Sequence, residues 1–307
     1  MISQFFLILL LNLQVVTWSV VPVQLAVISY GCYWVTTHEV TNFEFFGMAW
    51  AVGIYAGGIG ITVGHELCHK NSAFERFCGR LLMCSTSYGH FYIEHTMGHH
   101  KMVATDNDPA TARCGENFYA FLPRVVFGEL ASAIHLENDR IHNKGLPFWH
   151  HEIPYYFGAS IAMCYAFGAL FGPEAKSMFL AQSAVAILLF ESVNYLEHYG
   201  LERRRDAKTG EYETVKPQHS WDSPAKVTNM FLFKLQRHAD HHAHAGKRFQ
   251  TLQAYDSSPQ LPSGYTTMIF LALFPPLWFA VMNPRLEAFR KTQKGQVWRF
   301  GPTPKAD

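Results

Sequence analysis

The stretch that decides the fold is FEFFGMAWAVGIYAGGIGITVGHELCH, residues 43–69. Its first part, Phe43 to Val63, is apolar over about the 20 residues that a helix needs to cross the hydrocarbon core of a membrane. The apolar run ends directly at His65, which begins the pattern His65-Glu-Leu-Cys-His69. The stretch therefore predicts a membrane helix that ends at a pair of histidines.

Three more membrane helices are predicted on either side of it. The complete set of expected spans is residues 4–37, 43–64, 153–171 and 176–196. Gly172 and Pro173 separate the last two, which suits antiparallel helices joined by a tight turn. The N-terminal stretch has no charged side chain up to residue 37 and carries Pro22 in its middle. It is compatible with one kinked crossing or a shallow hairpin, and we favour one crossing.

The last apolar run is different, because Pro275 and Pro276 interrupt residues 265–282. We interpret it as interfacial or re-entrant. Basic residues then orient the chain, since loops on the cytoplasmic side of a membrane are enriched in Lys and Arg. Residues 70–144 hold eight and residues 203–248 hold ten, whereas the opposite connections hold one between them. The sequence thus predicts a single all-α domain, residues 1–307, which is an integral-membrane helical bundle with a histidine-rich cytoplasmic cap at 65–150 and 198–263.

Composition agrees with a membrane protein. Of the 307 residues, 49% are hydrophobic and only 16% are charged, against about 25% charged in soluble domains. The net charge of +1 gives no reason to expect a nucleic-acid partner. The six cysteines form no C-x-x-C pair, so a disulfide framework and a zinc ribbon are both disfavoured.

Histidine is the residue that stands out, with 17 in the chain. Nine of them fall into four groups: His65 and His69; His95, His99 and His100; His198 alone, at the end of an apolar helix; and His238, His241 and His242. Spacings of three or four residues place side chains on one face of a helix. Adjacent imidazoles are costly to bury unless they bind something, so we interpret the groups as metal ligands.

Two metal chemistries fit part of this pattern. The motif H-E-x-x-H is also the signature of zinc proteases, but one zinc ion needs only three protein ligands and would leave six clustered histidines unexplained. Nine nitrogen donors suit two transition-metal ions, and imidazole is compatible with iron, copper, nickel or zinc. A histidine-lined metal transporter is a non-enzymatic alternative, but it should carry ionisable groups within its spans, which here are almost purely apolar.

The order of motifs closely resembles that of the integral-membrane alkane 1-monooxygenases of the membrane fatty-acid desaturase and hydroxylase superfamily. The matching segments are H-E-x-x-H at His65, H-x-x-x-H-H-x-x-x-A-T-x-x-D-P-A from His95 to Ala110, N-Y-x-E-H-Y-G-L from Asn194 to Leu201, and L-Q-R-H-x-D-H-H-A-H from Leu235 to His244. The resemblance covers roughly residues 43–284. Family members typically carry more N-terminal membrane helix than the 64 residues that precede His65 here.

This resemblance implies a non-haem diiron enzyme of the bacterial inner membrane, with its active site on the cytoplasmic side, that inserts one atom of O₂ into a terminal C–H bond of an alkane. Xylene and cymene methyl-group monooxygenases and acyl-chain desaturases or hydroxylases are the related alternatives. The implied ligands of the two iron ions are His65, His69, His95, His99, His100, His198, His238, His241 and His242. His244 is left out of the set.

Metal-bound histidines usually donate their other ring N–H to a carboxylate or a carbonyl. Glu197 and Asp240 are our candidates for this role, with Glu66 and Asp108 as further ones, although each could equally be a surface acid. An alkane offers no polar group, so its slot must be apolar. The helix face that leads back from His65 carries Ile61, Gly57 or Gly58, Ile54 and Trp50. Its glycines are also typical of close helix packing.

Monooxygenation needs two electrons per turnover from a reductant. The sequence has no G-x-G-x-x-G pattern for a nicotinamide or flavin cofactor, so a separate carrier must supply them. The resemblance implies a rubredoxin with its NAD(P)H-dependent reductase, or a ferredoxin-type donor as in the xylene relatives. Arg203 to Arg205 could dock an acidic carrier or anchor the chain at the membrane surface.

Overall fold

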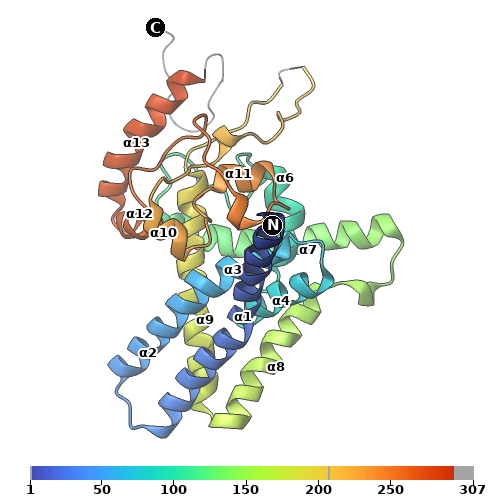
Figure 1. Ribbon diagram of the computed structural model, residues 1–307, viewed down its shortest axis with the longest axis vertical. Helices are drawn as coiled ribbons and strands as arrows, with labels where there is room; N and C mark the ends of the chain where they lie inside the picture. Colours follow the sequence, from blue (N-terminus) through green and yellow to red (C-terminus); the bar gives the residue numbers. More distant parts are fainter. Residues whose placement is uncertain (1, 207, 294–307) are drawn as a thin grey trace. The chain divides into compact units, whose positions relative to one another are not determined.

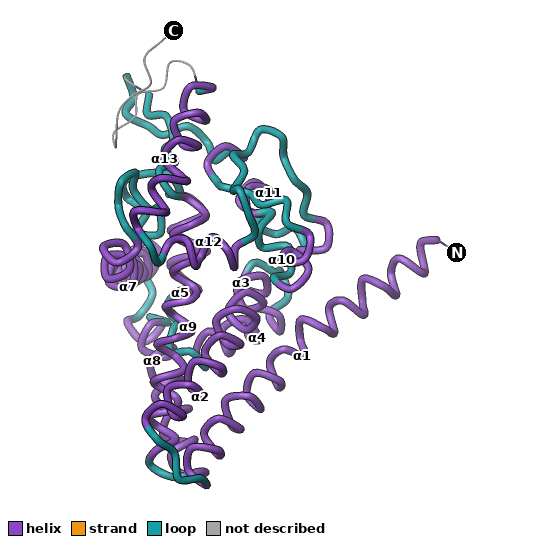
Figure 2. The backbone as a smooth tube through the Cα atoms, turned by 90° about the vertical axis from the view of Figure 1, so that its left-hand side faces the viewer, coloured by secondary structure: helices purple, strands orange, loops and turns teal. Residues whose placement is uncertain are grey.

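The computed structural model describes residues 2–206 and 208–293, with side chains from Gln14 onward. These residues form helices joined by loops (Figures 1 and 2), and their only β pairings are two isolated bridges. The chain divides into two compact units, Met1–Tyr92 with Glu137–Phe190 and Ile93–Leu136 with Glu191–Asp307. The prediction of an all-α fold is confirmed.

The first unit contains the long apolar helices. They are α1 (Ile2–Thr37), α2 (Asn42–Tyr55), the π-helical turn η1 (Ala56–Ile61), α3 (Thr62–Cys68), α4 (Ala73–Cys84), α8 (Ile153–Phe171) and the first part of α9 (Glu174–His198). Within the described residues, four helices are long and apolar enough to cross a membrane: Gln14–Thr37, Asn42–Cys68, Ile153–Phe171 and Glu174–His198. The protein is therefore an integral membrane protein. Figure 2 shows α1 as one unbroken helix despite Pro22, in agreement with a single crossing.

Local sequence explains where these helices begin and end. Thr41 caps α2 by accepting from the Glu44 N–H while the Glu44 carboxylate accepts from the Thr41 N–H, which is a capping box. The turn between α8 and α9 is made at Gly172, whose φ of 120° favours a residue without a Cβ. The second span runs without a break through η1 to Cys68, so His65 lies within the helix and not beyond its end.

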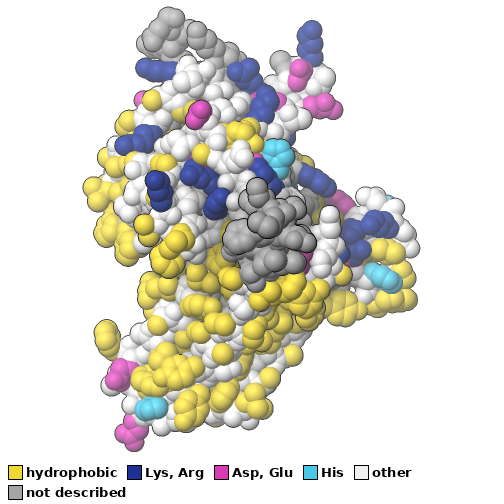
Figure 3. Space-filling view, in the orientation of Figure 1, with side chains coloured by type: hydrophobic (Ala, Val, Ile, Leu, Met, Phe, Trp, Pro, Cys, Tyr) yellow, Lys and Arg dark blue, Asp and Glu magenta, His cyan; other side chains and the backbone are white. Residues whose placement is uncertain are grey.

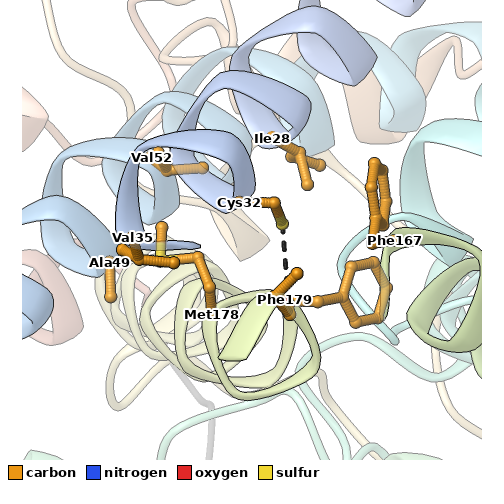
Figure 4. Packing of buried hydrophobic residues seen from close by; sticks show 9 residues of the cluster. Ile28, Cys32, Val35, Ala49, Val52, Phe167, Met178 and Phe179 are labelled. Atoms are coloured by element: carbon orange, nitrogen blue, oxygen red, sulfur yellow. Dashed lines mark hydrogen bonds between the residues drawn. The ribbon is translucent and has the colours of Figure 1, made fainter. Parts of the chain in front are cut away.

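A buried apolar core holds α1, α2, α8 and α9 together (Figure 4). The fully or almost fully buried members are Ile28, Cys32, Val35, Ala49, Val52, Phe167, Ala175, Met178 and Phe179. The Cys32 thiol also donates to the carbonyl oxygen of Ala175. In a bilayer such packing replaces the hydrophobic effect as the source of helix association.

Glycines let η1 approach its neighbours closely. A Cβ added at Gly57 would lie 2.7 Å from the carbonyl oxygen of Ala186 on α9, whereas one at Gly58 would meet only the Leu189 side chain at 3.6 Å. We therefore expect Gly57→Ala to destabilise the protein by about 1–3 kcal/mol, the usual cost of overpacking. Gly58→Ala is the matched control and should unfold like the wild type. Thermal unfolding in detergent measures both, and equal midpoints for the two variants would contradict this packing.

The second unit carries the shorter elements. They are the π-helical turn η2 (Glu94–His99), α6 (His100–Met102), the first part of α7 (Phe118–Lys144), the last turns of α9, α10 (Lys226–Phe231), α11 (His238–Ala243), α12 (Tyr265–Ala272) and α13 (Pro275–Thr292). Short 3₁₀ turns occur at Pro217–His219 and Phe249–Thr251. The run predicted as interfacial or re-entrant forms two helices, α12 and α13, and α13 begins at Pro275 and Pro276.

Candidate metal centre

Four buried imidazoles of the second unit converge on one point. They come from η2 (His99), the last turn of α9 (His198) and α11 (His238 and His242), and their nitrogens lie within 4.8 Å of one another. The Nε2 atoms of His99 and His242 are 3.2 Å apart, those of His198 and His238 are 3.1 Å apart, and those of His242 and His238 are 3.0 Å apart. We call these residues the histidine quartet.

Groups behind two of the rings decide which nitrogen faces the centre. The Nδ1 of His99 lies 3.0 Å from a carboxylate oxygen of Asp108, and the Nδ1 of His198 lies 3.0 Å from the carbonyl oxygen of His219. Both partners accept, so each Nδ1 carries the proton and each Nε2 presents a lone pair to the centre. A neutral imidazole Nε2 carries at most one hydrogen, so with these two lone pairs the four Nε2 atoms cannot hydrogen-bond across all three of their contacts, and a cation at the centre resolves their arrangement.

The spacing fits a metal ion. An ion with metal–nitrogen bonds of about 2.1 Å separates neighbouring ligand nitrogens by roughly 3.0 Å in octahedral and 3.4 Å in tetrahedral geometry. The observed separations of 3.0–3.2 Å lie in this range. The pKa of His242 lies well below its usual value, mainly because the ring is buried and secondly because other imidazoles surround it. A neutral imidazole is the form that binds metal.

Three more histidines of the second unit form a neighbouring group, the histidine triad: His95, His100 and His241. The Nε2 of His100 lies 3.0 Å from that of His95 and 3.1 Å from that of His241. The π-helical turn makes this possible, because the His100 N–H bonds to the carbonyl oxygen of His95, five residues earlier. In an α-helix residues five apart point in different directions, whereas here the wide turn brings the His100 and His95 rings to 4.6 Å between centroids, edge to face at 84°.

The remaining two predicted ligands belong to the first unit. His65 lies in α3 and His69 caps its end, and their ring centroids are 5.4 Å apart at 81°. His65 is buried and His69 is partly buried. The neighbouring Glu66 pairs with Lys70, with 2.8 Å between the carboxylate oxygen and Nζ.

The carboxylates have different surroundings. Asp108 stands behind His99 and also accepts from the Ala110 N–H. Burial opposes its ionisation, but the His99 ring and its hydrogen bonds hold the pKa of Asp108 below its usual range.

Glu197 lies on the other side of the rings, because its carboxylate oxygen is 3.2 Å from the Nε2 of His238. Tyr265 donates to its second oxygen. Glu197 therefore borders the point where the quartet converges.

Among the hydrogen bonds of the residues that the structure describes, those of the Asp240 carboxylate go to groups other than the nine predicted ligands. Its carboxylate accepts from His244, Lys247, the Gln253 N–H and Tyr255. Burial raises the pKa of Asp240, but these donors outweigh it and hold the pKa below its usual value. The residue thus fastens the segment 244–255 to α11, the helix that carries three histidines.

We therefore expect Asp240→Ala to act on the metal through the fold. Removing a buried acceptor leaves its donors without a partner, which costs roughly 1–3 kcal/mol for each one that water cannot reach. Thermal unfolding should occur at a lower temperature, and metal content should fall with it. Asp240→Asn, which keeps two of the acceptor positions, should be milder. Full metal content and activity in Asp240→Ala would remove this residue from the site.

The helix face that was proposed to line a substrate slot is exposed at one end and buried at the other. Trp50 and Ile54 are exposed, whereas Gly57 and Ile61 are buried in the first unit. Gly57 packs against the backbone of α9, which is the close helix packing that glycines often allow.

Two functional groups escape a reading of the sequence. One is the carbonyl of His219, which has no side-chain signature. Two residues later, the Trp221 indole N–H donates to the Tyr199 carbonyl and its backbone N–H donates to the Glu197 carbonyl, so this segment fastens the end of α9. The second group is Glu94, fully buried beside Ser132. The pKa of Glu94 lies well above its usual value, mainly because the side chain is buried and secondly because the Asp108 carboxylate is nearby.

Comparison with known proteins agrees with this centre. Residues 41–272 match the fatty acid desaturase family. Alkane 1-monooxygenase 2 of Pseudomonas aeruginosa is 44% identical over 92% of this chain and 76% of its own length. Alkane 1-monooxygenase of Acinetobacter baylyi is 42% identical over 87% of this chain and 66% of its own length.

A more distant relative is the xylene/toluene monooxygenase hydroxylase component of Pseudomonas putida, which is 27% identical over 78% of this chain and 63% of its own length. The chain spans between 63% and 76% of the length of these three relatives. The resemblance inferred from the histidine motifs is confirmed. The chain belongs to the fatty acid desaturase family and is a homologue of the alkane 1-monooxygenases.

Proposed function

We propose that this protein hydroxylates the terminal carbon of alkanes, using O₂ and forming 1-alkanols. The observation that carries the proposal is the convergence of imidazole nitrogens in the buried quartet and in the neighbouring triad. Seven histidines of one unit exceed what a single zinc ion of a protease requires. The alkane substrate is taken from the two relatives named alkane 1-monooxygenase.

We assign two iron ions to the nine histidines. The quartet would hold one ion, and the triad would contribute to the other. His65 and His69 are counted among the nine ligands because of their H-E-x-x-H motif and the family. When bound, the ions would supply the activation of O₂ that inserts one oxygen atom into a C–H bond. The protein itself fixes the tautomers through Asp108 and the His219 carbonyl and keeps water from the buried rings.

We also propose that the active site faces the cytoplasm of a bacterial cell and that electrons come from a rubredoxin or a ferredoxin-type donor. The excess of Lys and Arg near the histidine motifs supports this side of the membrane. Of the three consecutive arginines, Arg203 is buried and its guanidinium donates to the carbonyls of Lys101 and Glu213. Arg204 and Arg205 are exposed, so they are the ones that can meet an acidic carrier.

Substitution of both exposed arginines by glutamate should raise the KM for the donor and weaken its dependence on salt, while kcat changes little, because charges at the edge of an interface act mainly on association. Steady-state assays with varied rubredoxin at two salt concentrations measure this. Lys208→Glu, in the adjoining turn, is the matched control for added negative charge. An unchanged KM would place the donor elsewhere.

The activity is tested by product analysis. The purified protein in nanodiscs receives rubredoxin, its reductase, NADH and either a medium-chain alkane, a methylbenzene or an acyl thioester. We expect 1-alkanol that depends on O₂ and on the donor, and none with His238→Ala. Benzylic alcohol alone would favour the xylene type, and an olefinic acyl chain alone would favour a desaturase; either result would overturn the alkane assignment.

A further inference from the structure

Large apolar side chains are exposed on α10, on α12 and at the start of α13, all in the second unit. On α10 these are Val227, Met230 and Phe231, spaced three and four residues apart as one helical face requires. The other three are Phe270 on α12, Phe274 in the turn between α12 and α13, and Leu277 in the first turn of α13. The six side chains are between 56% and 71% exposed. We call them the α10–α12 surface.

Polar contacts fasten α10 and α12 side by side. The Gln236 amide oxygen accepts from both the Thr228 hydroxyl and the Tyr265 N–H at the start of α12. Gly264, which precedes α12, packs so closely on α10 that a Cβ there would lie 2.4 Å from the Thr228 hydroxyl oxygen. These contacts hold the two helices that carry most of the six apolar side chains next to each other. Figure 3 shows hydrophobic side chains gathered over this part of the unit, with Lys and Arg beside them.

The chain segments that carry this surface contain charges of one sign only. Residues 224–237 and 260–286 contain no Asp or Glu, but they contain Lys226, Lys234, Arg237 and Arg285. Lys226 and Arg285 are exposed. Exposed apolar side chains of this extent mark a contact with a partner or a membrane, and basic residues at their edge favour a partner with negative charge.

We propose that the α10–α12 surface lies in the interface of the bilayer, with its apolar side chains between lipid chains and Lys226 and Arg285 at anionic headgroups. α12 has eight residues, about 12 Å of helix, so it is too short to span the membrane. Short amphipathic helices with apolar residues on one face and basic residues beside them bind in this way. A second copy of the chain suits the surface less, because a symmetric contact would bring the basic residues together.

This contact would give the unit that carries seven of the histidines its own attachment to the membrane. The unit would then be held at the bilayer by lipid contacts of α10 and α12, in addition to the spans that continue into it through α9. The inference does not depend on which substrate is oxidised, since it concerns only how this unit meets lipid.

Depth-dependent quenching tests the proposal. The half-exposed Cys114 and Cys164 are first replaced by serine, and a nitrobenzoxadiazole label is then attached to Phe270→Cys or Met230→Cys. The full chain is placed in nanodiscs of phosphatidylcholine, with or without phosphatidylglycerol, that contain lipids with a doxyl quencher near the headgroup or near the chain end. The matched control is the same label at Lys208→Cys, an exposed position in a polar turn.

We expect blue-shifted emission and several-fold stronger quenching at positions 270 and 230 than at 208, with the shallow quencher more effective than the deep one. Phosphatidylglycerol should strengthen the quenching, and Lys226→Glu with Arg285→Glu should remove that dependence. Label emission at 270 and 230 that matches position 208 would overturn the proposal. Shielding that appears only in preparations with more than one chain per particle would also overturn it and would assign the surface to a second copy.

Discussion

His198→Ala is expected to abolish hydroxylation and to remove metal from the protein. The Nε2 of His198 faces the quartet, 3.1 Å from that of His238, and its Nδ1 hydrogen-bonds to the His219 carbonyl. Each of the other three imidazoles already supplies its own nitrogen to the quartet, so the loss of His198 leaves one ligand position empty. Losing a hydrogen-bond partner behind a metal ligand typically costs 10–100-fold in metal affinity or activity. Loss of a proposed ligand should cost more than this. Metal analysis of the purified variant and a coupled assay measure both effects.

The matched control for that variant is His244→Ala. His244 follows the last histidine cluster in the sequence, but it is exposed and bonds only to Asp240 among the contacts described. It should retain metal and most of the activity. If His198→Ala kept full metal content while His244→Ala lost it, the quartet would be the wrong set of ligands.

Asp108→Ala is expected to give the second-largest effect, a loss of roughly 10–100-fold in metal affinity or turnover. Its carboxylate accepts from the Nδ1 of His99 and from the Thr111 hydroxyl, and both groups are buried. Without it His99 can take the other tautomer, whose Nε2 carries a proton and cannot bind metal. Metal titration of the apoprotein separates weaker binding from slower turnover.

Two variants make this test specific. Asp108→Asn keeps an oxygen that can accept from His99, so it should recover a large part of the lost affinity. Asp106→Ala removes an exposed carboxylate two residues away and should behave like the wild type. Equal losses in Asp108→Ala and Asp106→Ala would indicate a general effect of charge and not a role in holding the His99 tautomer.

Much of the fold follows from simple patterns in the sequence. A helix near 153–171 and its partner across Gly172 are predicted by apolar length and a turn residue, and the structure has α8 and α9 there. The helix after Phe43 was predicted to end at residue 64 but runs on to Cys68. Polarity at His65 suggested an end, whereas burial of the side chains from Thr62 to Cys68 allows the helix to continue.

The histidine groups are easier to predict from the sequence than their geometry. Motif spacing selects the nine histidines proposed as ligands, yet it assumes α-helical turns. The π-helical turn at Glu94–His99 brings His95 and His100 together at i and i+5, a spacing that no α-helical pattern selects. The His219 carbonyl could not be identified because a backbone group has no residue type, and its position depends on how Trp221 fastens the end of α9.

The carboxylates show the same limit. Sequence proximity to a histidine suggests that an acid supports the metal, but it does not say from which side. Asp108 lies behind a ring, Glu197 lies in front of one, and Asp240 turns to the segment 244–255. Only the three-dimensional arrangement of α9, α11 and η2 distinguishes these positions.

The measurement that tests the central claim most directly is the metal content of the purified protein, combined with Mössbauer spectroscopy of protein produced with ⁵⁷Fe. Nine histidine ligands predict about two iron ions per chain, both in nitrogen-rich sites, and their loss from His198→Ala. A single zinc ion per chain, with no iron and full occupancy in His198→Ala, would contradict the diiron assignment.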